Sequence, residues 1–147
     1  MSVFAQGDEG IKGFEEVIKN LNKEIKAIQD RTMFGLIEAA VFIRRDMDET
    51  PPLIPVDTGN LRASWFTETF RQGELFGLTI GFNANYAVYV HEMVGADFTS
   101  PRWRSRPGGK QYWYTPREGA GAKFFEAALK RNGDKIIKII QETAKIK

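Results

Sequence analysis

Few residues of this chain could catalyse a reaction. The most suggestive are Asp57, Thr58 and Gly59, an Asp-Thr-Gly triplet. Retropepsin-like aspartic proteases carry this triplet at their active site, where two such carboxylates share a proton and activate a water. That site needs an apolar strand leading into the triplet, whereas here three prolines lie within the seven residues before Asp57. We therefore predict a turn, in which Asp57 accepts hydrogen bonds from backbone N–H groups ahead of it and Gly59 has a positive φ.

Nucleophilic and metal chemistry have weaker support. One histidine, His91, and no cysteine cannot supply a usual zinc site. Ser64 or Ser100 could formally join His91 in a triad, but neither lies in a Gly-x-Ser-x-Gly elbow. The sequence also lacks a glycine-rich phosphate loop followed by Lys-Ser or Lys-Thr. We expect no catalytic residue, no metal and no cofactor, and we assign His91 to structural or interface packing.

The strongest binding signal lies between Phe98 and Arg117. This stretch carries five basic residues and no acidic one, so the rest of the chain has a net charge of −3. Its mixture of arginine, tryptophan and tyrosine is typical of protein–protein hot spots, and it could also stack bases and neutralise phosphates. We predict an arm over about residues 95–117 that contacts a neighbouring subunit, with nucleic acid and its own domain as alternatives. The predicted contact residues are Arg102, Trp103, Arg104, Arg106, Tyr112, Trp113 and Tyr114, and outside the arm Tyr86, Tyr89 and His91.

The spacing of apolar residues predicts the elements that position these groups. Residues 11–47 repeat apolar or small residues every three or four positions, which predicts a helix, with a kink or break between Asp30 and Gly35. Residues 61–70 and 75–82 are predicted strands joined by a turn at 71–74. Residues 86–92 fit helix or strand, and 119–146 predict a second long helix.

These elements predict an α+β fold in a single domain over residues 1–147. A small antiparallel β-sheet packs against the two long helices, and a long β-hairpin or extended arm projects from it. Hydrophobic residues make up 42% of the chain, a composition typical of globular proteins. The side chains expected to be buried are Phe14, Leu21, Ile25 and Ile28 in the first helix and Phe125, Leu129, Ile136 and Ile140 in the second.

The sequence gives no sign of a membrane partner. No apolar run approaches the roughly 18 residues that span a bilayer. The first ten residues also lack the charged-then-apolar pattern of a signal peptide. We expect the protein to be made and used in a cytosol-like solution.

Three segments, taken in order, resemble the tail-component family of lambda-like tailed phages, whose members are labelled minor tail, neck or tail-completion proteins. They are residues 55–64 (PVDTGNLRAS), 81–92 (GFNANYAVYVHE) and 121–129 (GAKFFEAAL). Family members typically carry Pro-x-Asp-Thr-Gly-x-Leu-x-x-Ser, then a Tyr-Ala-x-Tyr-Val-Glu-like segment, then a Phe-centred start of a C-terminal helix. The resemblance covers roughly residues 10–145. It departs after Glu92, where the family usually has Glu-Phe-Gly-Thr, so it says nothing about the arm.

The resemblance implies a structural virion protein without catalysis, assembled in the host cytoplasm. Such a protein forms a ring at the head–tail junction that completes the tail or connects it to the head, with six copies favoured and twelve as the alternative. Its implied partners are other copies of itself, neighbouring neck, connector or tail-tube proteins and, non-specifically, packaged DNA. A tail terminator ring capping the tube is an alternative role. Two hypotheses from other classes are a DNA-binding module that uses the arm and a small hydrolase that uses Asp57.

Overall fold

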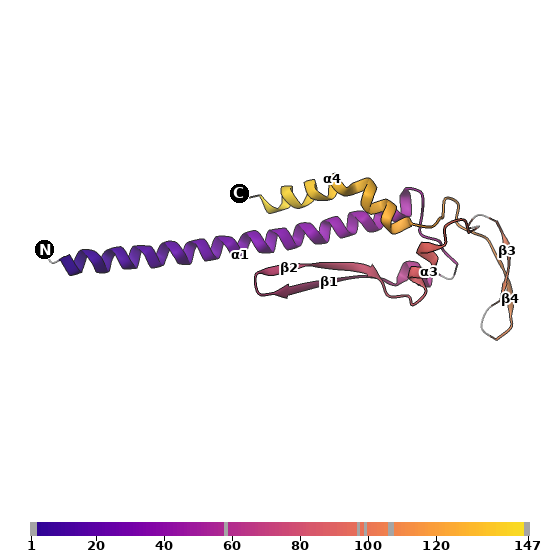
Figure 1. The fold of residues 1–147 in the computed structure, drawn as a ribbon, viewed down its shortest axis with the longest axis horizontal. Coiled ribbons are helices and arrows are strands. Elements are labelled where there is room, and N and C mark those ends of the chain that lie inside the picture. Colours follow the sequence, from indigo (N-terminus) through magenta and orange to yellow (C-terminus); the bar gives the residue numbers. More distant parts are fainter. Residues whose placement is uncertain (1–2, 58, 97, 99, 106–107, 146–147) are drawn as a thin grey trace.

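One long helix forms the axis of an elongated molecule (Figure 1). The computed structural model describes residues 3–57, 59–96, 98, 100–105 and 108–145. Helix α1 runs without interruption from Val3 to Glu49. Helix α4 (Phe124–Ala144) lies antiparallel to its C-terminal part, and the hairpin of β1 (Trp65–Gln72) and β2 (Leu75–Phe82) lies along another side. The N-terminal part of α1 extends beyond both neighbours (Figure 1).

The remaining elements gather at the other end of the molecule. They are the short helices α2 (Asn60–Ala63) and α3 (Ala87–Glu92) and the hairpin of β3 (Arg102–Ser105) and β4 (Gln111–Tyr114). The four strands form two separate antiparallel pairs, with Trp65 opposite Phe82 in one and Trp103 opposite Trp113 in the other. The predicted α+β class is confirmed. The ambiguous segment 86–92 is helical, and the first predicted strand starts late because α2 occupies its beginning.

The core lies where α1, α2, α4 and β2 meet. Its largest fully buried side chains are Met47, Ile54 and Phe124. The Phe124 ring packs edge-on against Phe82 and His91, with centroids 5.7 and 5.2 Å apart. A cluster of T-shaped aromatic contacts therefore joins α4, β2 and α3.

The predicted burial of the long helices is partly wrong. Four of the eight side chains are exposed, namely Phe14 (66%), Leu21 (57%), Ile25 (50%) and Leu129 (38%), whereas Ile28, Phe125, Ile136 and Ile140 are half-buried. An apolar stripe on a helix predicts that this face will be buried, but it does not predict which element or partner buries it. At 1.5 Å per residue, α1 is about 70 Å long and α4 about 31 Å, so α4 is too short to cover the stripe.

The kink or break predicted in α1 is also wrong, since the helix runs without interruption through residues 30–35 (Figure 1). Glycine at position 35 instead allows a close contact between two helices. A Cβ placed on Gly35 would lie 3.1 Å from Ile140 Cα and 3.2 Å from Thr143 Cβ. The missing side chain lets the two backbones approach, and this packing offsets the roughly 1 kcal/mol that glycine costs inside a helix. A second contact between the two helices involves Asn132 of α4, whose side-chain amide donates hydrogen bonds to Asp46 and to the Ala128 carbonyl.

The turn before α2 supports a first prediction. Gly59 has φ 85° and ψ −5°, the left-handed conformation that the sequence predicts, and a Cβ there would meet no atom within 4 Å. Gly59→Val should therefore lower the free energy of unfolding by more than about 1 kcal/mol through backbone strain alone. Gly59→Asn should cost less, because asparagine tolerates this region. Denaturant midpoints of the three proteins test this; equal midpoints would refute the strained turn.

Candidate functional site

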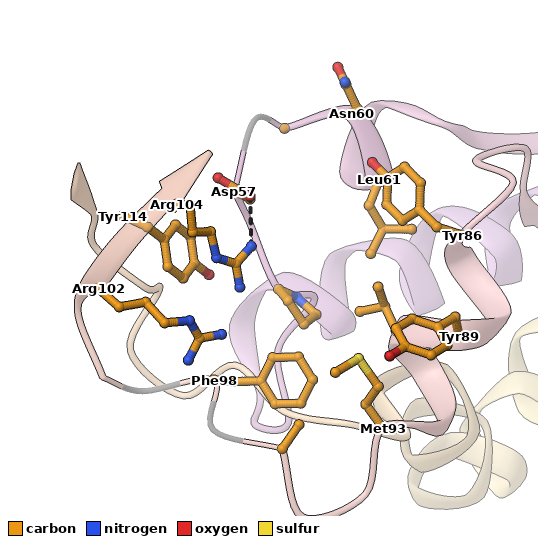
Figure 2. Close-up of a pocket in the computed structure, with 14 residues that line it drawn as sticks. Asp57, Asn60, Leu61, Tyr86, Tyr89, Met93, Phe98, Arg102, Arg104 and Tyr114 are labelled. Carbon is orange, nitrogen blue, oxygen red and sulfur yellow. Dashed lines mark hydrogen bonds and ion pairs between the residues drawn. The ribbon is translucent and has the colours of Figure 1, made fainter. Parts of the chain in front are cut away.

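Side chains on one of the two faces of the β3–β4 hairpin hold it against the turn at Asp57. We call this face of the hairpin the inner face. The Asp57 carboxylate accepts a hydrogen bond from Arg104 Nη1 at 2.7 Å (Figure 2). It accepts another from Tyr112 Oη at 2.5 Å. The Arg104 guanidinium also lies 4.1 Å from the ring centroid of Tyr114, which is only 4% exposed. The prediction that Asp57 acts within its own turn therefore missed its main partners, which lie in the hairpin. Thr58 lies outside the described residues.

The strand register divides the hairpin into two faces. Arg102 is opposite Tyr114 and Arg104 is opposite Tyr112, and these four side chains share the inner face because side chains alternate along a strand. Trp103 is opposite Trp113 on the outer face. The two indoles make an edge-to-face pair with centroids 5.4 Å apart, and they are 64% and 54% exposed. We call this exposed Trp103–Trp113 pair the tryptophan ridge.

A cavity of about 460 Å³ opens between the inner face of the hairpin, the Asp57 turn and α3 (Figure 2). Its walls are largely aromatic and apolar, and two guanidinium groups line it. We call it the aromatic pocket; its principal lining residues are Tyr86, Tyr89, Met93, Phe98, Arg102 and Arg104. Tyr86 and Tyr89 remain 39% and 70% exposed. Such a pocket can hold an aromatic side chain, with cation–π contact to an arginine.

His91 has a structural environment, which accords with the packing role predicted for it. Its Nε2 accepts a hydrogen bond from the Glu126 backbone N–H at 3.3 Å, and its Nδ1 lies 3.0 Å from Glu92 Oε1. In the neutral ring the proton is therefore on Nδ1, which donates to Glu92. Hydrogen bonds to Glu92, first from Lys123 and then from His91, lower the pKa of the Glu92 carboxyl. The ring thus links α3 to the start of α4.

The structure brings together seven of the ten residues predicted for an interface. Arg102, Arg104, Tyr114, Tyr86 and Tyr89 line the aromatic pocket, and Trp103 and Trp113 form the ridge. Tyr112 binds Asp57 instead, His91 packs on α4, and Arg106 lies outside the described residues. The alternative that the arm packs on its own domain is therefore correct for the inner face of the hairpin, while its outer face is exposed.

Sequence reasoning missed an arginine cluster around Asp48. The Asp48 carboxylate accepts hydrogen bonds from Arg44 at 2.5 Å, Arg62 at 3.1 Å and Arg117 at 2.7 Å. Arg117 also donates to the Asp48 backbone carbonyl at 2.6 Å. The cluster joins α1, α2 and the segment that follows the hairpin. Arg117 follows Asp48 by 69 residues in the sequence, so no local pattern could reveal the cluster.

Low pH should destabilise the fold, because it protonates the Asp48 carboxylate of this cluster and the neighbouring Asp46 carboxylate. Burial opposes ionisation of Asp48, but hydrogen bonds from Arg117 and Arg44 outweigh it and lower its pKa. Burial also opposes ionisation of Asp46, and hydrogen bonds from Arg131 and Asn132 likewise lower its pKa. Because both carboxyls have a depressed pKa in the folded state, their stabilisation is present above about pH 4 and is lost as the pH falls below it.

We therefore expect the free energy of unfolding to decrease between about pH 5 and pH 3. Asp48→Asn should be less stable than the natural chain at pH 7 and should show a shallower loss of stability in acid. Urea midpoints measured across this pH range test the expectation, with the exposed-site variant Asp134→Asn as control. An unchanged pH slope in Asp48→Asn would show that Asp48 does not carry the effect.

Two structural features are absent from the described part of the chain. None of its His, Cys, Asp or Glu side chains form a group of three or more that could hold a metal ion. Its helices include none that is both long and apolar enough to cross a membrane. Comparison with known proteins finds no matching family model, no matching curated protein and no matching solved structure.

Proposed function

We propose that this chain is a structural subunit of the neck of a tailed bacteriophage, where copies of it form a ring at the head–tail junction that completes the tail or connects it to the head. The observation that carries this proposal is that one chain presents both the tryptophan ridge and the aromatic pocket, on opposite faces of one hairpin. The ridge cannot enter the pocket of its own chain, so each surface is available to another copy.

Two different surfaces on one subunit are what a ring requires. Contacts around a rotation axis are heterologous, so each copy uses one surface toward the next copy and another toward the previous one. In the proposed contact, the ridge of one copy enters the pocket of the next, where Arg102 can lie over an indole and Tyr86 and Tyr89 can pack beside it. The resemblance in the sequence favours six copies. A terminator ring that caps the tail tube would use the same contact.

The other two classes of function are weakened by contacts within the chain. DNA binding by the arm would need free cations, but Arg104 is paired with Asp57 and Arg117 with Asp48. A hydrolase would need a carboxylate free to bind water, but both oxygens of Asp57 accept hydrogen bonds from Arg104 and Tyr112. The two arginines and the Asp57 carboxylate therefore stabilise the fold of the chain itself.

A mixing experiment tests the ridge-to-pocket contact. One variant, Trp103→Ala/Trp113→Ala, lacks the ridge, and the other, Tyr86→Ser/Tyr89→Ser, lacks two walls of the pocket. Each alone should fail to form rings. In an equimolar mixture the ridge-to-pocket contact should join the two variants in pairs but should not close a ring, because one ridge and one pocket remain in each pair. If the pocket variant still forms rings, the ridge binds elsewhere and the proposed contact is wrong.

A further inference from the structure

The N-terminal part of α1 carries a strict heptad pattern. Large apolar side chains stand at positions 14, 18, 21, 25 and 28, with alternating steps of four and three residues. Four of them are exposed, namely Phe14 (66%), Ile18 (41%), Leu21 (57%) and Ile25 (50%). A narrow seam with this spacing is typical of helices in a coiled coil, whereas a helix that packs on a globular body carries a wider stripe. We call these four side chains the α1 seam.

The same spacing continues into the contact with α4. Thr32, Gly35 and Ala39 follow the seam, and Gly35 lies against Ile140 of α4 while Ala39 is buried. Because α4 runs antiparallel to α1, its last turn reaches only the region of Asp30 to Gly35, where Glu142 and Thr143 border a hollow beside Asp30 and Phe34. Before Asp30 the seam continues without the helix that covers its later part (Figure 1).

We propose that α1 of a second copy of this chain packs on the seam, antiparallel to the first, and continues the line of α4. Phe14 of each copy then lies opposite Ile25 of the other, and Ile18 opposite Leu21. The contact is isologous, since each residue pair occurs twice about a two-fold axis between positions 18 and 21. This inference goes beyond the proposed ring, because a two-fold contact joins two copies and cannot by itself close a ring.

The antiparallel orientation follows from the position of α4. In a parallel pair, the α1 of the second copy would continue as one helix alongside the first to Glu49, into the space that α4 occupies. In an antiparallel pair, only the first turns of the second copy's α1 come near the end of α4.

The flanking positions are compatible with this pairing. Beside the seam, Glu15 of one copy lies near Asn22 of the other, and Val17 near Glu24. Glu24 is already paired with Arg31 of its own chain at 3.1 Å. No like charges therefore face each other directly across the seam, so electrostatic repulsion does not oppose the pair.

Substitutions in two parts of the same helix provide the test. Ile18→Gln/Leu21→Gln makes the seam polar, and Ile37→Gln/Val41→Gln is the matched control, with side chains 38% and 56% exposed on a part of α1 outside the proposed contact. Both pairs are introduced into Trp103→Ala/Trp113→Ala protein, which lacks the proposed ring contact, and this parent protein should show a monomer–dimer equilibrium in sedimentation. The seam variant should raise the dimer dissociation constant by at least about 100-fold, while the control should change it less than about threefold. Circular dichroism checks that both variants keep their helix content.

Cysteine cross-linking tests the orientation, since the chain has no cysteine of its own. A mixture of Phe14→Cys and Ile25→Cys proteins should form a mixed disulfide on oxidation. Phe14→Cys alone should not, because two residues at position 14 would be about 16 Å apart in the antiparallel pair. Cross-linking of Phe14→Cys with itself would show a parallel pair and overturn the orientation. A monomeric natural chain at about 100 µM, or equal dimerisation by the seam variant, would overturn the proposal.

Discussion

Under the proposed neck role, a phage that carries Trp103→Ala and Trp113→Ala in this chain is expected to make filled heads and finished tails that remain unjoined. Exposed tryptophans that anchor an interface typically contribute about 2 kcal/mol or more each, and a ring repeats the contact at every subunit. Infectious titre should therefore fall by at least about 100-fold. Plaque counts give the titre, and electron microscopy of the lysate shows whether heads and tails are separate.

The purified double variant should still fold. Both indoles are more than half exposed, so their removal should change the free energy of unfolding by less than about 1 kcal/mol. Phe34→Ala removes an equally exposed aromatic ring from α1 and is the control for the loss of any surface ring. Normal titre in the tryptophan variant would contradict the proposed role of the ridge, and so would the same loss of titre in Phe34→Ala.

The largest loss of stability is expected from Phe124→Ala. Phe124 is 1% exposed, and its ring contacts Phe82 of β2 and His91 of α3 from the first residue of α4. Removal of a fully buried phenylalanine costs about 3–5 kcal/mol, because it removes apolar burial and leaves a cavity where three elements meet. Much of the stability of a domain of this size would be lost.

Leu129→Ala on the same helix is the matched control. Leu129 is 38% exposed, so its truncation should cost less than about 1.5 kcal/mol. Chemical denaturation of both variants and the natural chain measures the difference. Equal losses at positions 124 and 129 would contradict the core described above, because they would mean that the two side chains have similar surroundings.

Elements with local signals were predictable from the sequence. Each long helix has a repeated spacing of apolar residues, and the turn between β1 and β2 contains Gly73, which has φ 61°. The left-handed Gly59 follows from the Asp-Thr-Gly triplet in a proline-rich segment. In all these cases the structure depends mainly on residues within one turn or one helix of each other.

The partners of these elements were not predictable. Asp57 pairs with Arg104, which is 47 residues later, and Asp48 with Arg117, which is 69 residues later. A carboxylate can pair with any basic residue that the fold brings near it, and one sequence does not show which. Gly35 was interpreted as a helix breaker because glycine has a low helix propensity. Helix propensity is a local property and does not include the close approach of another helix, which requires glycine at this position.

The proposed neck ring is tested most directly by measuring the mass of the protein alone and after incubation with purified tails of the proposed parent phage. A neck subunit should bind the tails as a closed ring with a fixed number of copies, six being favoured. In the same experiment, Trp103→Ala/Trp113→Ala protein should form no ring. A natural chain that neither binds tails nor assembles beyond a dimer, alone or with tails, would contradict the proposed neck ring.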